Sequence, residues 1–198
     1  ISGMLDFARE SALELEQCNI NEVVKQSIEK VQFEFHLAQT QLELDFEEGL
    51  PPVSIDVLKI EEVLINIMTN AVQAMGHGGT LRISTSVDQG TKILRESGVG
   101  KPRPELRADV ITIDIRDTGP GIPDEQLGKV TDPFFTTKPK GEGTGLGLAI
   151  VKSILSQHHG NLLLKNMKNP KGLRVRLVLP PQGVGTFVES ESVEALES

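Results

Sequence analysis

The sequence predicts an α/β domain that is preceded by a helical segment. Residues 56–75 and 148–158 repeat apolar side chains at helical spacing, which is typical of helices with one buried face. Several shorter stretches alternate apolar and polar residues, or are bounded by turn residues, as strands are. The strands are expected near Gln41, Leu81, Val110, Leu162 and Leu173.

The first 40 residues are expected to be mainly helical. Residues 2–16 repeat apolar side chains at helical spacing and are typical of the end of a longer helix. A second helix follows, and Asn19 or Asn21 is placed to cap it. Its buried face is expected to hold Ile20, Val24, Ile28, Val31 and Phe35.

Caps and turns mark the boundaries in the rest of the chain. Asp56 is placed to cap the long helix, and the glycine-rich run 76–79 ends it. A turn at 169–172 joins the last two strands, and a short helix is expected at 124–127. Residues 88–109 have no apolar period and are expected to form a long surface loop.

The composition argues against several functional classes. The 198 residues carry a net charge of −8 with no cluster of lysines and arginines, so nucleic acid is not an expected partner. No apolar run approaches the roughly 18 residues that span a bilayer, so we expect no direct membrane contact. The one cysteine, Cys18, cannot form an internal disulfide, which favours a cytoplasmic location. The pattern leaves open whether a longer protein is anchored in a membrane.

A glycine-rich run immediately precedes the second long helix. Gly141, Gly143, Gly145 and Gly147 stand at alternate positions, so the backbone can turn sharply and its N–H groups can converge on an anion. The helix that begins near Leu148 directs its partial positive charge at the same place. The run predicts a cradle for nucleotide phosphates, and a plain surface loop is the alternative interpretation of the glycines alone.

A polar strip runs along the first long helix. Asn66, Asn70 and Gln73 stand at i, i+4 and i+7 and share one face of a helix that is otherwise largely apolar. Such amides need partners, because an unsatisfied buried amide costs roughly 1–3 kcal/mol. Nucleotide phosphates and a hydrated metal ion would supply them. The alternative is that the strip is a solvated outer face.

Asp117 follows a strand that is expected to be buried and precedes Gly119 and Gly121. A carboxylate at such a strand end can accept a hydrogen bond from an exocyclic amine, which favours adenine over guanine. Turn formation is the other reason for aspartate and glycine to occur together. It does not explain the later glycines.

In identity and order, these motifs resemble the ATP-binding catalytic domain of sensor histidine kinases. That domain belongs to a superfamily with gyrase-type, Hsp90-type and MutL-type ATPases, called GHKL or Bergerat-fold proteins. Asn66 and Asn70 resemble the family's asparagine box, and residues 117–121 resemble its first glycine box. Residues 132–138 resemble the phenylalanine box, and residues 141–148 the second glycine box.

The resemblance implies a two-layer α/β sandwich with a mixed sheet backed by helices. Residues 1–18 resemble the end of a dimerisation-hairpin helix, and residues 19–180 resemble the catalytic ATP-binding domain with its leading helix. Residues 181–198 form an acidic tail, which is expected to be disordered.

The resemblance also implies how the domain binds its cofactors, ATP and Mg²⁺. Asn70 is the expected Mg²⁺ ligand, with Asn66 and Gln73 near the phosphates or a metal-bound water. Asp117 is expected to hold the adenine amine. The residues expected to shape the base pocket are Gly119, Gly121 and Ile122.

A mobile lid is expected over this site. Lys138 could pair with a phosphate oxygen and is placed, with Asn66 and Asn70, among the catalytic residues. The other expected lid and phosphate-cradle residues are Thr136, Thr137, Gly141, Gly143, Thr144, Gly145, Leu146 and Gly147.

The chemistry implied is transfer of the ATP γ-phosphoryl group to a histidine of a dimerisation domain, and onward to a response regulator receiver domain. The full-length protein is expected to be a homodimer. Family members carry the acceptor histidine before Glu or Asp, a pattern that His36, His77, His158 and His159 do not match. These histidines are expected to be structural or solvated, and the chain to bind ATP with little or no autophosphorylation.

Other functions are compatible with the same motifs. A conformational ATPase of the Hsp90 or MutL kind carries a glutamate where this chain has Asn66, and an amide cannot act as a general base. A Ser/Thr kinase of the anti-sigma-factor type shares the boxes but usually lacks the upstream helices. A module that only docks on a response regulator is disfavoured by the intact site residues.

Overall fold

A five-stranded sheet forms one layer of the molecule. The computed structural model describes residues 12–89, 109–136 and 143–181. The strand order is β2-β4-β5-β7-β6, with β2 parallel to β4 and the other neighbours antiparallel, so the sheet is mixed. The strands are β2 (Gln41–Phe46), β4 (Thr80–Gln89), β5 (Asp109–Arg116), β6 (Asn161–Lys168) and β7 (Lys171–Leu179).

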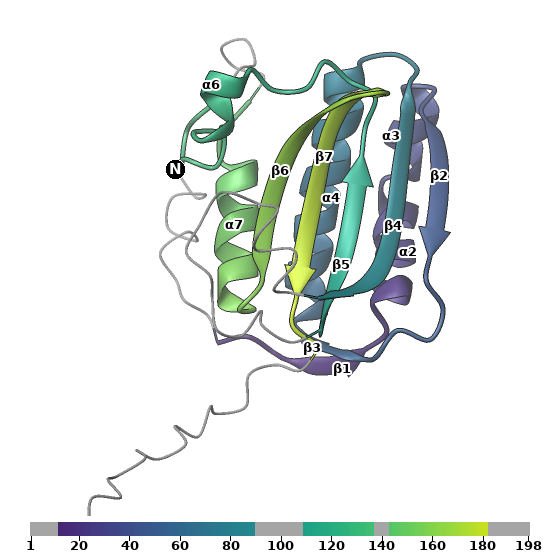
Figure 1. The fold of residues 1–198 in the computed structure, drawn as a ribbon, viewed down its shortest axis with the longest axis vertical. Coiled ribbons are helices and arrows are strands. Elements are labelled where there is room, and N and C mark those ends of the chain that lie inside the picture. The colour runs from purple at the N-terminus through teal and green to yellow at the C-terminus, as the bar shows by residue number, and fades with distance from the viewer. Residues whose placement is uncertain (1–11, 90–108, 137–142, 182–198) are drawn as a thin grey trace, which may run out of the picture.

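Helices form the second layer, and the predicted α/β sandwich is confirmed. Figure 1 shows α4, α2 and α3 behind the sheet, with α7 beside β6. None of the helices in the described ranges is long and apolar enough to cross a membrane. The helices are α2 (Ile20–Lys30), α3 (Gln32–Leu37), α4 (Val57–Met75), α6 (Asp124–Leu127) and α7 (Gly147–Gln157).

Side-chain caps start the two longer N-terminal helices where the sequence predicts. Asn19, rather than Asn21, caps α2 by accepting a hydrogen bond from the Asn21 N–H at 2.9 Å. Asp56 caps α4 by accepting from the Lys59 N–H at 3.1 Å. Gly76 ends α4 with a φ of 74°, a conformation that glycine adopts without a steric penalty.

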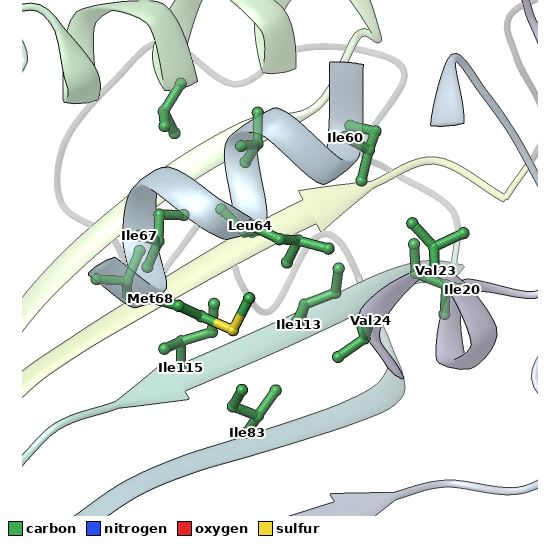
Figure 2. Packing of buried hydrophobic residues seen from close by; sticks show 14 of the residues in the cluster. Ile20, Val23, Val24, Ile60, Leu64, Ile67, Met68, Ile83, Ile113 and Ile115 are labelled. Atoms are coloured by element: carbon green, nitrogen blue, oxygen red, sulfur yellow. The ribbon is translucent and has the colours of Figure 1, made fainter. Parts of the chain in front are cut away.

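The apolar face of α4 packs against the middle of the sheet. Figure 2 shows Ile60, Leu64 and Met68 of this helix above Ile113 of β5 and Ile83 of β4. All five side chains are fully buried. Each contributes about 1.5–3 kcal/mol of hydrophobic free energy. The centre of the sheet and α4 therefore form the core that supports the rest of the domain.

The N-terminal part of the described chain differs from the prediction. The helix expected to reach Glu16 is wrong at its end, because residues 12–15 have no regular structure and β1 (Glu16–Cys18) is a strand. This strand pairs antiparallel with β3 (Val53–Ile55), which the sequence analysis did not predict. The single helix expected from residue 20 to Phe35 is divided at Val31 into α2 and α3.

The predictions for the short helix, the long loop and the two ends of the chain have different outcomes. The short helix at 124–127 is confirmed as α6. Asp88, Gln89 and Asp109 belong to strands rather than to the predicted loop. The rest of that loop, residues 1–11 of the expected dimerisation-hairpin helix, and the acidic tail from residue 182 lie outside the described residues.

His158 links the end of α7 to the start of α4. Its Nε2 accepts a hydrogen bond from the Asp56 N–H at 3.0 Å, and its Nδ1 lies 2.8 Å from the Ile154 carbonyl oxygen. These contacts fit a neutral ring that carries its proton on Nδ1. Burial lowers the pKa of His158 below its usual 6.5, because desolvation disfavours the charged ring. Asp56 also accepts from the Glu14 N–H at 3.2 Å, so the incoming chain joins the same network.

We predict that stability depends on pH through His158. The pKa of this residue is lower in the folded chain than in the unfolded chain, so stability is full above about pH 6.5 and is lost as pH falls below it. His158→Gln should reduce this loss, because glutamine can accept the same hydrogen bond without titrating. Urea unfolding at several pH values measures the effect. His77→Gln, at an exposed position, is the control and should keep the wild-type pH dependence. Equal slopes for all three proteins would contradict the prediction.

Candidate functional site

A cavity of about 680 Å³ lies between α4, α7 and the ends of β5 and β7. Its walls come from α4, from the segment that follows β5, and from residues 143–148 at the start of α7. The sequence analysis placed the polar strip, the aspartate and the glycine run on these same segments. The structure brings them together around one space, which is large enough for a small-molecule ligand.

The α4 wall of the cavity is polar. Asn66, Asn70 and Gln73 all line it. The Asn66 amide is oriented by its Nδ2, which donates to the Glu62 carbonyl at 3.0 Å. A Cβ placed on Gly147 would stand 3.2 Å from the Asn66 Oδ1. Glycine at the start of α7 therefore lets that helix approach the asparagine strip closely.

Asp117 lies at the end of β5 and is only 4% exposed. Its Oδ1 accepts hydrogen bonds from the Gly119 N–H at 2.8 Å and the Leu173 N–H at 3.1 Å. Burial raises the pKa of Asp117 above its usual 3.8, and the two backbone hydrogen bonds act in the opposite direction. The carboxylate is thus held rigidly, with Oδ1 committed to the protein backbone.

Gly172 allows β7 to pass directly against Asp117. A Cβ on Gly172 would overlap the carbonyl oxygen of Asp117. The Asp117 N–H also donates to the Leu173 carbonyl at 3.0 Å, so backbone and side chain of the aspartate both bond to the same residue. This close approach explains why glycine occupies the second position of β7.

A second close approach joins the phenylalanine-rich segment to the glycine run. A Cβ on Gly145 would stand 2.5 Å from the carbonyl carbon of Phe134. Both residues have a left-handed backbone, with φ of 66° at Gly145 and 67° at Phe134. This contact fixes one wall of the cavity against another.

The N-terminus of α7 offers backbone N–H groups to the cavity. Gly147 and Leu148 line it, and no side chain in the described part of the chain caps this helix. Thr144, which also lines the cavity, accepts a hydrogen bond from the Leu146 N–H at 3.3 Å. Uncapped N–H groups and the helix dipole together stabilise an anion.

Most of the predicted site residues that the structure describes line this cavity. Gly119 and Leu146 do not, although the Gly119 N–H holds Asp117 and Leu146 precedes α7. Thr137, Lys138 and Gly141 lie outside the described residues, so their roles stay predictions. The predicted residues that line the cavity are Asn66, Asn70, Gln73, Asp117, Gly121, Ile122, Thr136, Gly143, Thr144, Gly145 and Gly147.

The sequence analysis missed several wall residues. Gln126 of α6 lines the cavity, and its Oε1 is buried without a hydrogen-bond partner in the described part of the chain. Such an acceptor suits a donor group on a ligand. The missed apolar wall lies partly on strands, whose inward positions depend on the sheet order, and partly on the segment after α6. It includes Ile115, Val130, Phe135, Leu173 and Val175.

Comparison with known families identifies this arrangement. Residues 55–183 match the family described as histidine kinase-, DNA gyrase B- and HSP90-like ATPases. The chain belongs to this ATPase family. The predicted resemblance is confirmed, and membership of an ATPase family implies that the domain binds ATP.

Individual relatives of this ATPase domain are sensor histidine kinases. The chain is 32% identical over 180 residues to sensor histidine kinase ZraS of Escherichia coli O157:H7, covering 91% of this chain and 34% of that protein. It therefore spans about a third of that kinase's length. The catalytic domain of histidine kinase ThkA, in a nucleotide-free form, is 25% identical with a TM-score of 0.69, covering 86% of this chain and 98% of the other. A structure of ThkA in complex with response regulator protein TrrA is 23% identical with a TM-score of 0.69, covering 91% and 46%.

We predict that Gly145→Ala weakens ATP binding by about tenfold or more. Alanine at this left-handed position costs about 1–2 kcal/mol in backbone strain, and its Cβ would clash with Phe134, so the cavity wall must shift. Gly128→Ala is the matched control, because nothing lies within 4 Å of a Cβ there and its φ is −72°. Equilibrium titration with ATP compares the two variants. Equal affinities would show that the close contact does not shape the site.

Proposed function

We propose that this domain binds Mg²⁺-ATP and presents the γ-phosphoryl group to a histidine on the dimerisation domain of the same protein. The observation that carries the proposal is the placement of a buried carboxylate and a strip of amides on the walls of one cavity. The carboxylate can accept a hydrogen bond from the adenine base. The amides and the start of α7 can bind the phosphates. Phosphoryl transfer depends mainly on such positioning and on charge neutralisation.

Asp117 would select adenine. Because Oδ1 already accepts two backbone N–H bonds, Oδ2 is the atom that would accept the exocyclic amine. Guanine carries an oxygen acceptor at the same position, which the carboxylate would repel. Gly121 and Ile122 would form the adjacent wall of the base pocket, and Gln126 supplies a further acceptor.

The donor set of α4 fits Mg²⁺. Among the described residues, no group of three or more His, Cys, Asp and Glu side chains could hold a metal ion. An ATP-bound Mg²⁺ needs no such group, since it keeps several waters and takes few protein ligands. Asn70 would be its side-chain ligand, with Asn66 and Gln73 nearby. Bound there, the ion would neutralise part of the phosphate charge, and the neutral amides would leave its charge to the triphosphate.

Phosphate transfer is better supported than steady hydrolysis. A conformational ATPase uses a carboxylate to activate water, and Asn66 is a neutral amide whose Nδ2 is engaged with Glu62. No histidine among the described residues lines the cavity. His158 is buried, and both of its ring nitrogens are hydrogen-bonded to the protein backbone. The acceptor histidine would therefore come from outside this domain.

The proposed partners are a dimerisation domain and a response regulator. The similar kinase ThkA forms a complex with a response regulator protein, and the relative ZraS is named a sensor histidine kinase. We infer that the full-length protein is a homodimer whose phosphohistidine passes its phosphoryl group to a receiver domain. A cytoplasmic location is part of this proposal, because ATP is available there.

We predict that Asp117→Asn lowers ATP affinity by about 10- to 100-fold. The new amide must keep its oxygen toward the Gly119 and Leu173 N–H groups, so its NH₂ faces the base and opposes the adenine amine. The same NH₂ can donate to guanine, so the ratio of GTP to ATP affinity should rise. Competition titrations with both nucleotides measure this ratio.

The fold should survive Asp117→Asn. Because burial raises the pKa of Asp117, the charged form is disfavoured in the folded chain, and stability falls as pH rises from about 3.8 through the raised value. A neutral amide removes that cost at neutral pH. A variant that stays folded with an unchanged GTP-to-ATP ratio would show that Asp117 does not read the base.

We predict that ATP binding depends on Mg²⁺ through Asn70. Calorimetric titration of the wild type should give saturable binding that is tighter with Mg²⁺, without sustained heat afterwards. Asn70→Ala should remove most of the Mg²⁺ effect, because the side-chain oxygen ligand is gone. Lys59→Ala, on the exposed first turn of α4, is the control. Sustained heat in the wild type would instead indicate hydrolysis and the conformational ATPase.

A further inference from the structure

The side-chain amide of Asn166 on β6 clamps the main chain of Ile122. Its Oδ1 accepts a hydrogen bond from the Ile122 N–H at 2.9 Å, and its Nδ2 donates to the Ile122 carbonyl at 2.5 Å. The same Nδ2 lies 3.0 Å from the Asp124 Oδ1. One amide therefore satisfies both backbone groups of a residue 44 positions away, as a neighbouring strand would.

Gly121 is shaped to accept this clamp. A Cβ there would stand 2.6 Å from the Asn166 Oδ1, and the φ of Gly121 is 78°. Any larger residue would push the amide away from Ile122. The glycine of the first glycine box thus serves the contact with Asn166 as well as the turn itself.

The clamped segment forms part of the wall of the large cavity. Pro120, Gly121 and Ile122 line the large cavity assigned to ATP. Of these three residues, Pro120 also lines a second cavity of about 390 Å³, together with Asn166 and residues of α6. Because the segment faces a cavity, it gains less from packing than a core segment does, so its hydrogen bonds matter more.

We propose that Asn166 is a positioning residue for the base pocket of the ATP site. This inference rests on the proposed function. Asn166 does not line the large cavity; it holds Ile122 and Gly121 where the base would pack. Without these hydrogen bonds, the segment with Gly121 and Ile122 must become ordered when the nucleotide binds. The entropy lost in that step weakens the binding of the base. Affinity for the triphosphate, which is expected beside α4 and α7, should be little changed.

The test compares ATP with Mg²⁺-tripolyphosphate, which lacks the base, in the Asn166→Ala variant. Both are titrated as competitors of a fluorescent ATP analogue. We expect ATP to bind about tenfold more weakly than to the wild type, and tripolyphosphate to stay within about twofold. Asn166→Ser is the milder variant, because one hydroxyl can replace at most one of the two bonds to Ile122. Its loss should be intermediate.

Two control variants separate positioning from a general loss of structure. Asn161→Ala changes the same residue type at the other end of β6, where the side chain accepts a hydrogen bond from the adjacent Leu162 N–H. Asp124→Asn alters the third contact of Asn166 and leaves the clamp on Ile122 in place. Both should bind ATP as the wild type does. Thermal unfolding of every variant confirms that it is folded.

The possible outcomes separate a failure of this inference from a failure of the proposed function. Wild-type chain that binds neither ATP nor tripolyphosphate would overturn the proposed function, and the inference with it. Wild-type binding of ATP with no selective loss in the Asn166 variants would overturn the inference alone. Equal weakening of both ligands would show that Asn166 supports the whole domain rather than the base pocket.

Discussion

The burial of one carboxylate organises the site end of this domain. A buried charge is costly unless hydrogen bonds satisfy it, and Asp117 receives two backbone N–H bonds at a single oxygen. Those bonds come from the glycine turn after β5 and from the first part of β7, so they tie the two segments together. Gly172 makes the tie sterically possible. The fold therefore fixes the orientation of the other carboxylate oxygen, Oδ2, before any ligand binds.

The long helix α4 serves the core and the site at the same time. Ile60, Leu64 and Met68 anchor one face in the core, which leaves the strip of Asn66 and Asn70 no freedom to rotate away from the cavity. The start of this helix is held by His158 from α7 and by the chain entering at Glu14. Hydrogen bonds at Asp56 thus connect the start of α4 with the end of α7 and with the segment around Glu14.

Local patterns predicted the elements, and long-range contacts decided what they missed. Helical period located α4 and α7, the Asp56 cap located the start of α4, and the i, i+4 spacing of Asn66 and Asn70 located one wall. The three-residue strands β1 and β3 are too short to show a period, and they exist because they pair with each other. Asn166 has no local signal, since its partner is 44 residues away. Such contacts depend on the sheet order, which a single sequence does not contain.

The glycines near the site serve the packing of the chain as well as the binding of an anion. From sequence, alternate glycines indicate backbone that converges on an anion, and the start of α7, which no described side chain caps, agrees with that interpretation. Yet Gly145, Gly121 and Gly172 each stand against another part of the protein, where a Cβ would collide with Phe134, Asn166 or Asp117. Their first requirement is close packing of chain on chain. Phosphate contacts become available because these segments are already brought together, so the glycine boxes build the site before they bind anything.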